Sequence, residues 1–139
     1  MPNKHLEHPE DSIIAGRRVA LRAVKELIST KKLSVKWDGA PAIVFGINPS
    51  NGQFFVGTKS VFNKRRPKIN YSPEDIDKNH KGTLADILRL CFRYLPRYHR
   101  IIQCDWIGVG GGSCYQPNTI EYRFHSPCYS RIIVAPHTE

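Results

Sequence analysis

The sequence predicts an α+β fold with a largely antiparallel sheet and two main helices. Two segments carry apolar residues at helical spacing, whereas several shorter runs are rich in β-branched and aromatic residues. The predicted order is α, β, β, β, α, β, β, β, with hairpins rather than regular helical crossovers. The length of 139 residues suits one domain, 1–139, which can bury a core.

The first helix is predicted to begin at Asp11 or Ser12, because either side chain can cap it. It is predicted to run to about Ser29, and Gly16 weakens its first turns. Apolar residues near helical spacing predict a buried stripe, formed by Ile14, Leu21, Val24, Leu27 and Ile28.

Three strands are predicted to follow the first helix. The apolar run 33–37 forms the first strand and ends in the turn Lys36-Trp37-Asp38-Gly39. The second strand covers 40–47 and the third covers 53–58. Asn51-Gly52 lies between them and is a strong signal for a hairpin.

The second helix is predicted from Leu84 to about Leu95, with Thr83 as its cap and Pro96 ending it. A short helical turn is predicted to open at Pro73. The apolar face of the second helix is Leu84, Ile87, Leu88, Cys91, Phe92 and Leu95.

Three more strands are predicted over 101–107, 119–124 and 131–135. The glycine-rich segment 108–113 invites comparison with a phosphate cradle. It lacks the Gly-Lys-Ser/Thr ending of a P-loop, and no helix follows it. A loop between strands is therefore the favoured interpretation.

Composition narrows the classes of partner. Twenty-one Lys and Arg residues against twelve Asp and Glu residues give a net charge of +9, which favours polyanions such as nucleic acid or nucleotide phosphates. A solvated basic face is the simpler alternative.

No stretch approaches the roughly 20 apolar residues of a membrane helix, so we expect a soluble protein with no membrane partner. The four cysteines form no Cys-x-x-Cys pair, which predicts reduced thiols in the cytoplasm.

The segment 59–71 combines basic and aromatic residues. Phe62 and Tyr71 are interleaved with five basic side chains, which are Lys59, Lys64, Arg65, Arg66 and Lys68. Basic groups contact phosphates and aromatic rings stack on bases, so this segment can hold a nucleic-acid strand. A solvated surface loop explains the same residues equally well.

Three features of the sequence around Lys36 favour a catalytic role over that of a solvated surface side chain. It lies in an apolar strand-like sequence, is followed by Asp38 and Gly39, and is joined downstream by Lys59. A desolvated lysine near other cations has a lowered pKa and becomes an amine nucleophile. Such an amine can attack an α-phosphate and expel pyrophosphate, with Mg²⁺ screening the phosphates.

Lys36-Trp37-Asp38-Gly39 resembles the Lys-x-Asp-Gly motif of the covalent nucleotidyltransferases, the superfamily of ATP-dependent DNA ligases, RNA ligases and mRNA capping enzymes. Thr58-Lys59-Ser60 resembles the next motif. Segment 103–107 resembles the strand whose acid binds ribose or metal, and Tyr122-Arg123-Phe124 resembles the segment that stacks the purine. From His5 to His137 the chain is similar to ligase-like proteins of large tailed phages, including cyanophages.

The resemblance implies an ATP-dependent nucleic acid ligase-like enzyme that forms a covalent lysyl-AMP. Lys36 and Asp38 are then catalytic, and Lys36, Lys59, Asp105 and Phe124 bind the nucleotide. Asp105 also holds Mg²⁺ or Mn²⁺. Nucleic acid, either DNA or RNA, is bound by Lys59, Lys64, Arg65, Arg66 and Lys68.

The sequence departs from the superfamily at three places. Pro41 stands where ligases often have Arg, and Cys104-Asp105 stands where they favour Gly-Glu. The sequence has no Glu-Gly-x-Val-x-Lys segment and no final Lys-x-Lys, so the resemblance is to a truncated adenylation domain. These departures keep an alternative open. On that alternative the chain is a non-catalytic nucleic-acid-binding or virion-associated module, located in the host cytoplasm or in the virion.

Overall fold

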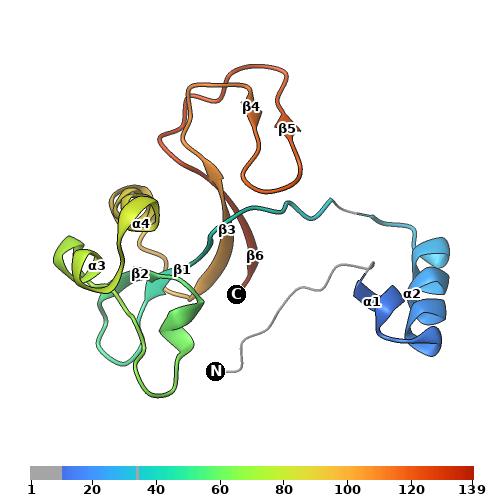
Figure 1. Cartoon of the computed structure of the whole chain (residues 1–139), viewed down its shortest axis with the longest axis horizontal. Coiled ribbons are helices and arrows are strands. Elements are labelled where there is room, and N and C mark those ends of the chain that lie inside the picture. Colours follow the sequence, from blue (N-terminus) through green and yellow to red (C-terminus); the bar gives the residue numbers. More distant parts are fainter. Residues whose placement is uncertain (1–10, 34) are drawn as a thin grey trace. The chain divides into compact units, whose positions relative to one another are not determined.

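The computed structural model describes residues 11–33 and 35–139, which fall into two compact units. One unit ends at Lys36, and the other comprises Trp37–Glu139. The element bounds are α1 Asp11–Ile14, α2 Arg17–Ser29, β1 Ala42–Ile47, β2 Phe54–Gly57, η1 (a 3₁₀ helix) Lys59–Phe62, α3 Pro73–Asn79, α4 Gly82–Tyr94, β3 Ile102–Gly108, β4 Cys114–Tyr115, β5 Tyr122–Arg123 and β6 Ile133–Thr138 (Figure 1).

The unit that ends at Lys36 contains two helices where one was predicted. Gly16 separates α1 from α2, and its φ of 112° is a conformation that glycine adopts most readily. The predicted buried stripe is wrong: Leu21 is 52% exposed and Ile28 is 81% exposed. A helix buries an apolar face only against another layer, and these two helices bury no residue in the structure.

The strand predicted over 33–37 is also wrong. The described residues 33 and 35–40 form no strand, whereas Ser34 lies outside the described part of the chain. Leu33 and Val35 are exposed. A strand requires a pairing edge, and both edges of β1 are already paired, with β2 on one side and β3 on the other. The turn residues Trp37–Gly39 therefore continue from an irregular segment.

The larger unit is built on a four-stranded antiparallel sheet in the order β2-β1-β3-β6. The predicted hairpin at Asn51-Gly52 is confirmed. Gly52 has a φ of 69°, and the Asn48 N–H donates to the Gln53 carbonyl at 2.9 Å. The register pairs Phe45 with Val56 and Ala42 with Asp105, which aligns the start of β1 with the middle of β3.

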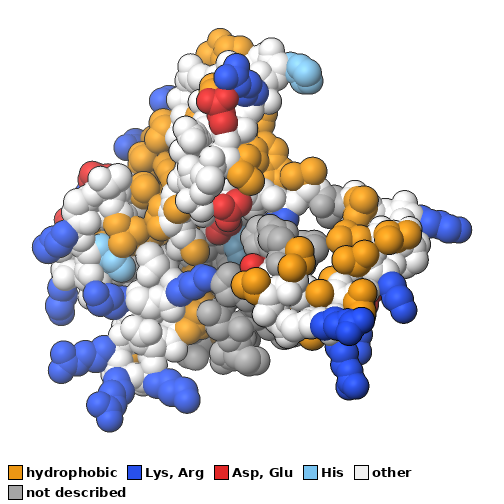
Figure 2. Space-filling model, turned by 45° about the vertical axis from the view of Figure 1, so that its right-hand side comes forward, with side chains coloured by type: hydrophobic (Ala, Val, Ile, Leu, Met, Phe, Trp, Pro, Cys, Tyr) orange, Lys and Arg blue, Asp and Glu red, His pale blue; other side chains and the backbone are white. Residues whose placement is uncertain are grey.

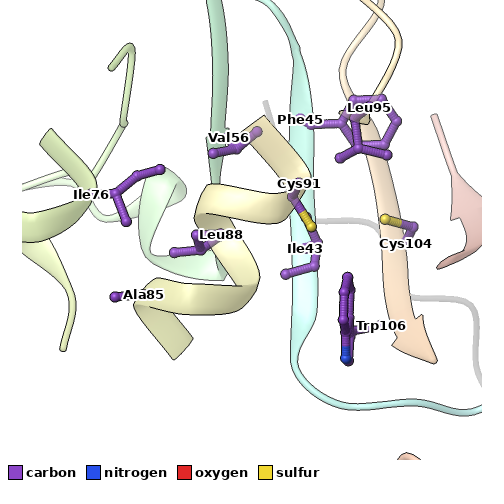
Figure 3. Close-up of a cluster of buried hydrophobic side chains, with 10 residues drawn as sticks. All are labelled: Ile43, Phe45, Val56, Ile76, Ala85, Leu88, Cys91, Leu95, Cys104 and Trp106. Carbon is purple, nitrogen blue, oxygen red and sulfur yellow. The ribbon is translucent and has the colours of Figure 1, made fainter. Parts of the chain in front are cut away.

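The main core lies between α4 and the sheet. Leu88 and Cys91 of α4 are fully buried and belong to one cluster with Ile43 of β1 and Trp106 of β3 (Figure 3). The predicted apolar face of the second helix is confirmed, although Leu84, Ile87 and Phe92 are only partly buried. The helix begins two residues before its predicted start, so Thr83 lies in its first turn and Lys81 precedes it. It ends at Tyr94, one residue before its predicted end at about Leu95, and Pro96 follows.

The opposite face of the sheet is covered by the segment after β2. Val44, Phe55 and Val61 form a second cluster, against which Phe62, Ile69 and Tyr71 pack. Residues 73–75 do open a short helix, α3, and the Ser72 hydroxyl accepts the Asp75 N–H at 3.2 Å. The basic segment is thus attached to a buried layer by its apolar residues.

The region after β3 differs from the prediction in its details. The glycine-rich segment is a loop between β3 and β4, and only Tyr122 and Arg123 of the predicted strand 119–124 form a strand. This short β4–β5 ribbon projects beyond the end of β3 (Figure 1). The last strand starts two residues late and continues through Thr138, which brings His137 into the sheet. No helix in the described residues is long and apolar enough to span a bilayer.

Candidate functional site

The turn Trp37–Gly39 lies directly against strand β3. The Gly39 N–H donates to the Asp105 carboxylate at 3.3 Å, and the Trp106 N–H donates to the Pro41 carbonyl at 3.0 Å. A Cβ on Gly39 would come within 2.2 Å of the Trp106 carbonyl oxygen. The glycine of the Lys-x-Asp-Gly segment is therefore required by close backbone approach.

Asp38 is held by the β4–β5 ribbon. The Tyr122 hydroxyl accepts the Asp38 N–H at 2.6 Å and donates to the Asp38 carbonyl at 3.0 Å. The Asn118 amide donates to the Asp38 carboxylate at 2.8 Å. The backbone and side chain of Asp38 are thus both fixed by residues about 80 positions later in the chain.

Trp37 opens onto an apolar groove. Its ring stacks on Tyr122 with centroids 4.4 Å apart and on Phe124 with centroids 5.7 Å apart. The groove has a volume of about 340 Å³. It is lined by Trp37, Ile107, Phe124, Ile133, Val134, Ala135 and Pro136. Such an aromatic-walled cavity suits a planar, largely apolar group.

Asp105 is the buried acid of the site. It is 7% exposed, and its second carboxylate oxygen lies 3.5 Å from His137 Nε2. Strand pairing is consistent with the contact: Asp105 pairs with Ala135, and His137 is the extra β6 residue at the register shift between the pairs Cys104–Pro136 and Gln103–Thr138. Sequence reasoning missed His137. The sequence signal that could have found His137 is the apolar run 131–135. A predicted strand longer by two residues would have included it.

The two predicted lysines have different surroundings. Lys36 is half-buried and belongs to the unit that precedes the site, one peptide bond from Trp37. Lys59 begins η1, is separated from the end of β2 by Thr58, and is exposed. Because Val44 pairs with Gly57 and Ala42 pairs with Asp105, Lys59 follows β2 at the end of the sheet where Asp105 lies.

Four basic residues form an exposed segment after η1. Lys64, Arg65, Arg66 and Lys68 are all exposed. Lys68 donates to the Asn79 carbonyl at 3.2 Å, which ties the end of the segment to α3. Figure 2 shows Lys and Arg side chains that stand apart at its lower left, with no acidic side chain coloured among them.

The described residues contain no group of three or more His, Cys, Asp or Glu side chains that could hold a metal. Asp105 contacts the residue that follows Asp38, because the Gly39 N–H donates to its carboxylate, whereas the Asp38 carboxylate accepts from Asn118. One or two carboxylates, completed by substrate phosphates, are a usual donor set for Mg²⁺. An ion of this kind would draw on Asp38 and Asp105, whose carboxylates here contact Asn118, Gly39 and His137.

Of the comparisons with known proteins, the comparison with protein-family models gives a match. No curated protein matches the chain, and no solved structure matches it. A family model with the description "Family of unknown function (DUF6267)" matches residues 3–139. Since that match covers almost the whole sequence, the chain belongs to the DUF6267 family.

Proposed function

We propose that the chain is a ligase-type nucleotidyltransferase that forms a covalent lysyl-AMP at Lys36. The observation that carries the proposal is the fixed turn next to Lys36. Asp38 and Gly39 are held by Tyr122 and Asp105 beside an aromatic-walled groove of about 340 Å³. A turn whose backbone is held this firmly by side chains from distant parts of the chain supports a catalytic role better than a solvated surface turn does.

The chemistry follows from an amine nucleophile. The Lys36 nitrogen uses its lone pair to bond to the α-phosphorus of ATP, and the bond from that phosphorus to the bridging oxygen breaks. Pyrophosphate leaves with the electron pair, and the amine loses its proton to solvent. The product is a phosphoramidate that can pass AMP to a nucleic-acid end.

Each neighbouring residue has a role in this proposal. Trp37 and Phe124 line the groove that takes the base, and Lys59 binds phosphate or ribose. Asp38 and Asp105 would hold Mg²⁺, which would neutralise charge on the phosphates. Asp105 also fixes the Gly39 backbone, so it has a structural contact in addition to its proposed ligand role.

The test is covalent labelling. The protein is incubated with α-labelled ATP and Mg²⁺, denatured, and separated by electrophoresis. We expect label on the wild-type protein and none on Lys36→Ala. Lys32→Ala is the matched control, because it removes an exposed lysine from the same unit and should label like wild type. Equal labelling of wild type and Lys36→Ala would overturn the proposal.

A second candidate function rests on the basic segment. A module that binds nucleic acid without catalysis is favoured by the exposed residues Lys64, Arg65, Arg66 and Lys68. No acidic residue lies between Lys59 and Pro73, so no local charge neutralises the segment. Counterion release then makes binding to DNA or RNA strongly dependent on salt.

Binding measured over a range of salt concentrations tests this candidate. Replacing Lys64, Arg65 and Arg66 together with serine should lower the magnitude of the log–log salt slope by about 3 if each contacts a phosphate. Lys36→Ala should leave the slope unchanged. An affinity that does not respond to salt would exclude this function.

A further inference from the structure

We propose that the β4–β5 ribbon is a clamp on the Lys36–Gly39 segment and that Tyr122 is its positioning residue. The catalytic consequence rests on the proposed function, whereas the clamp itself rests on contacts within residues 37–139. Neither the family match nor the resemblance to ligases assigns this role to Tyr122, whose segment was expected to stack a purine.

The Tyr122 hydroxyl forms hydrogen bonds with both the N–H and the carbonyl of the Asp38 backbone. It accepts the Asp38 N–H at 2.6 Å and donates to the Asp38 carbonyl at 3.0 Å. A phenol has one donor and can accept, so this arrangement uses its hydrogen-bonding capacity fully. A residue outside any strand thereby gains the backbone bonds that a sheet would have given it.

The ring of Tyr122 adds a second restraint. It stacks on Trp37 with an interplanar angle of 23°, so one side chain holds two consecutive residues of the turn. Asn118, from the turn between β4 and β5, holds the Asp38 carboxylate. Lys36 is joined to this clamped turn by its peptide bond to Trp37.

A second tyrosine of the ribbon, Tyr115, can be compared with Tyr122. Tyr115 is the cross-strand partner of Tyr122, and its hydroxyl makes the same pair of bonds to another residue. It accepts the Gly112 N–H at 3.2 Å and donates to the Gly112 carbonyl at 2.7 Å. One tyrosine therefore fastens the ribbon to its own loop, and the other fastens it to the Lys36–Gly39 segment.

Two variants separate these roles. Tyr122→Phe removes the hydroxyl and keeps the ring that stacks on Trp37, whereas Tyr115→Phe removes the same chemistry at Gly112. In Tyr122→Phe we expect the Asp38 amide to exchange its hydrogen roughly tenfold faster. Tyr115→Phe should leave the Asp38 amide at its wild-type rate. Unchanged exchange at Val44 in both variants shows that the sheet is intact.

Labelling kinetics test the catalytic consequence. Tyr122→Phe should lower the maximal rate of lysyl-AMP formation by about tenfold or more, because a small displacement of a nucleophile is costly. Its KM for ATP should stay close to wild type, since the groove residues are unchanged. Tyr115→Phe should match wild type in both constants.

The outcomes distinguish the clamp from the proposed function. If wild type forms no lysyl-AMP, the proposed function fails, and exchange at the Asp38 amide alone decides the clamp. If Tyr122→Phe leaves that exchange unchanged, the clamp is overturned even when wild type is labelled. If exchange accelerates while the labelling rate stays at the wild-type value, Tyr122 is a structural residue and its positioning role is overturned.

Discussion

Gly39 has the strictest steric requirement in the Lys36–Gly39 segment. A Cβ there would lie 2.2 Å from the Trp106 carbonyl oxygen, so backbone would have to move. Gly39→Ala should lower the free energy of unfolding by about 1–3 kcal/mol, as overpacking does. Urea unfolding measures the change. Gly112→Ala is the control, because its Cβ would meet only ordinary contacts at 3.9 Å and beyond. Equal stability of both variants would contradict the close approach.

His80 predicts a pH dependence of stability. It is buried, its Nε2 has no hydrogen-bond partner among the described residues, and desolvation together with the nearby Lys68 charge lowers its pKa below 6.5. The folded state therefore stays neutral while the unfolded chain takes up a proton, so stability falls as pH drops through 6.5 towards the lowered value.

The measurement is urea unfolding from about pH 7.5 to about pH 5.5, a range that brackets the ordinary pKa of histidine. His80→Gln should lose part of the wild-type decrease in stability over this range. His125→Gln, at an exposed position, should keep all of it. A decrease of the same size in wild type and His80→Gln would show that other groups cause it.

Single residues also show which contacts around the candidate site sequence patterns could anticipate. Asp105 was identified because an acid inside an apolar run is conspicuous, and the structure puts it in contact with the Lys36–Gly39 segment through Gly39. His137 and Asn118 were not identified, because their relation to Asp105 and Asp38 depends on strand register and loop path. Neither property is encoded in local spacing.

At the scale of elements, the two long helices look alike in sequence but differ in burial. Both carry an apolar stripe at helical spacing, yet α4 buries Leu88 completely and α2 leaves Leu21 52% exposed. Leu88→Ala should cost about 2–5 kcal/mol, whereas the same change at Leu21 should cost well under 1 kcal/mol. Thermal or urea unfolding compares them. A large loss from Leu21→Ala would show that the face of α2 is covered in solution.

The strand predictions were also confirmed in one place and wrong in another. The hairpin β1–β2 was predicted because Asn51-Gly52 encodes its turn within a few residues. Segment 33–37 has comparable β-propensity but forms no strand in its described residues, and β1, the strand that follows it, is already paired on both sides by β2 and β3. Propensity is local, whereas pairing depends on a partner elsewhere in the chain.

At the scale of the molecule, the core is confined to one unit. All buried hydrophobic residues of the described chain lie between Ile43 and Ile107. A shortened chain that begins at Trp37 should therefore unfold cooperatively, with a free energy within about 1 kcal/mol of the full chain. Tryptophan fluorescence during urea unfolding reports this, because Trp37 and Trp106 both remain. Loss of cooperative unfolding would show that the preceding residues complete the core.

The sequence by itself determined the α+β class, the β1–β2 hairpin, the apolar face of α4 and the motif around Lys36. These features depend on periodicity, turn chemistry and residue type, which act over a few positions. The tertiary structure alone decided which apolar stripe is buried, that Asp105 meets His137, and that Tyr122 holds Asp38. Those contacts join residues far apart in the chain, and their geometry follows from sheet register and packing rather than from local propensity.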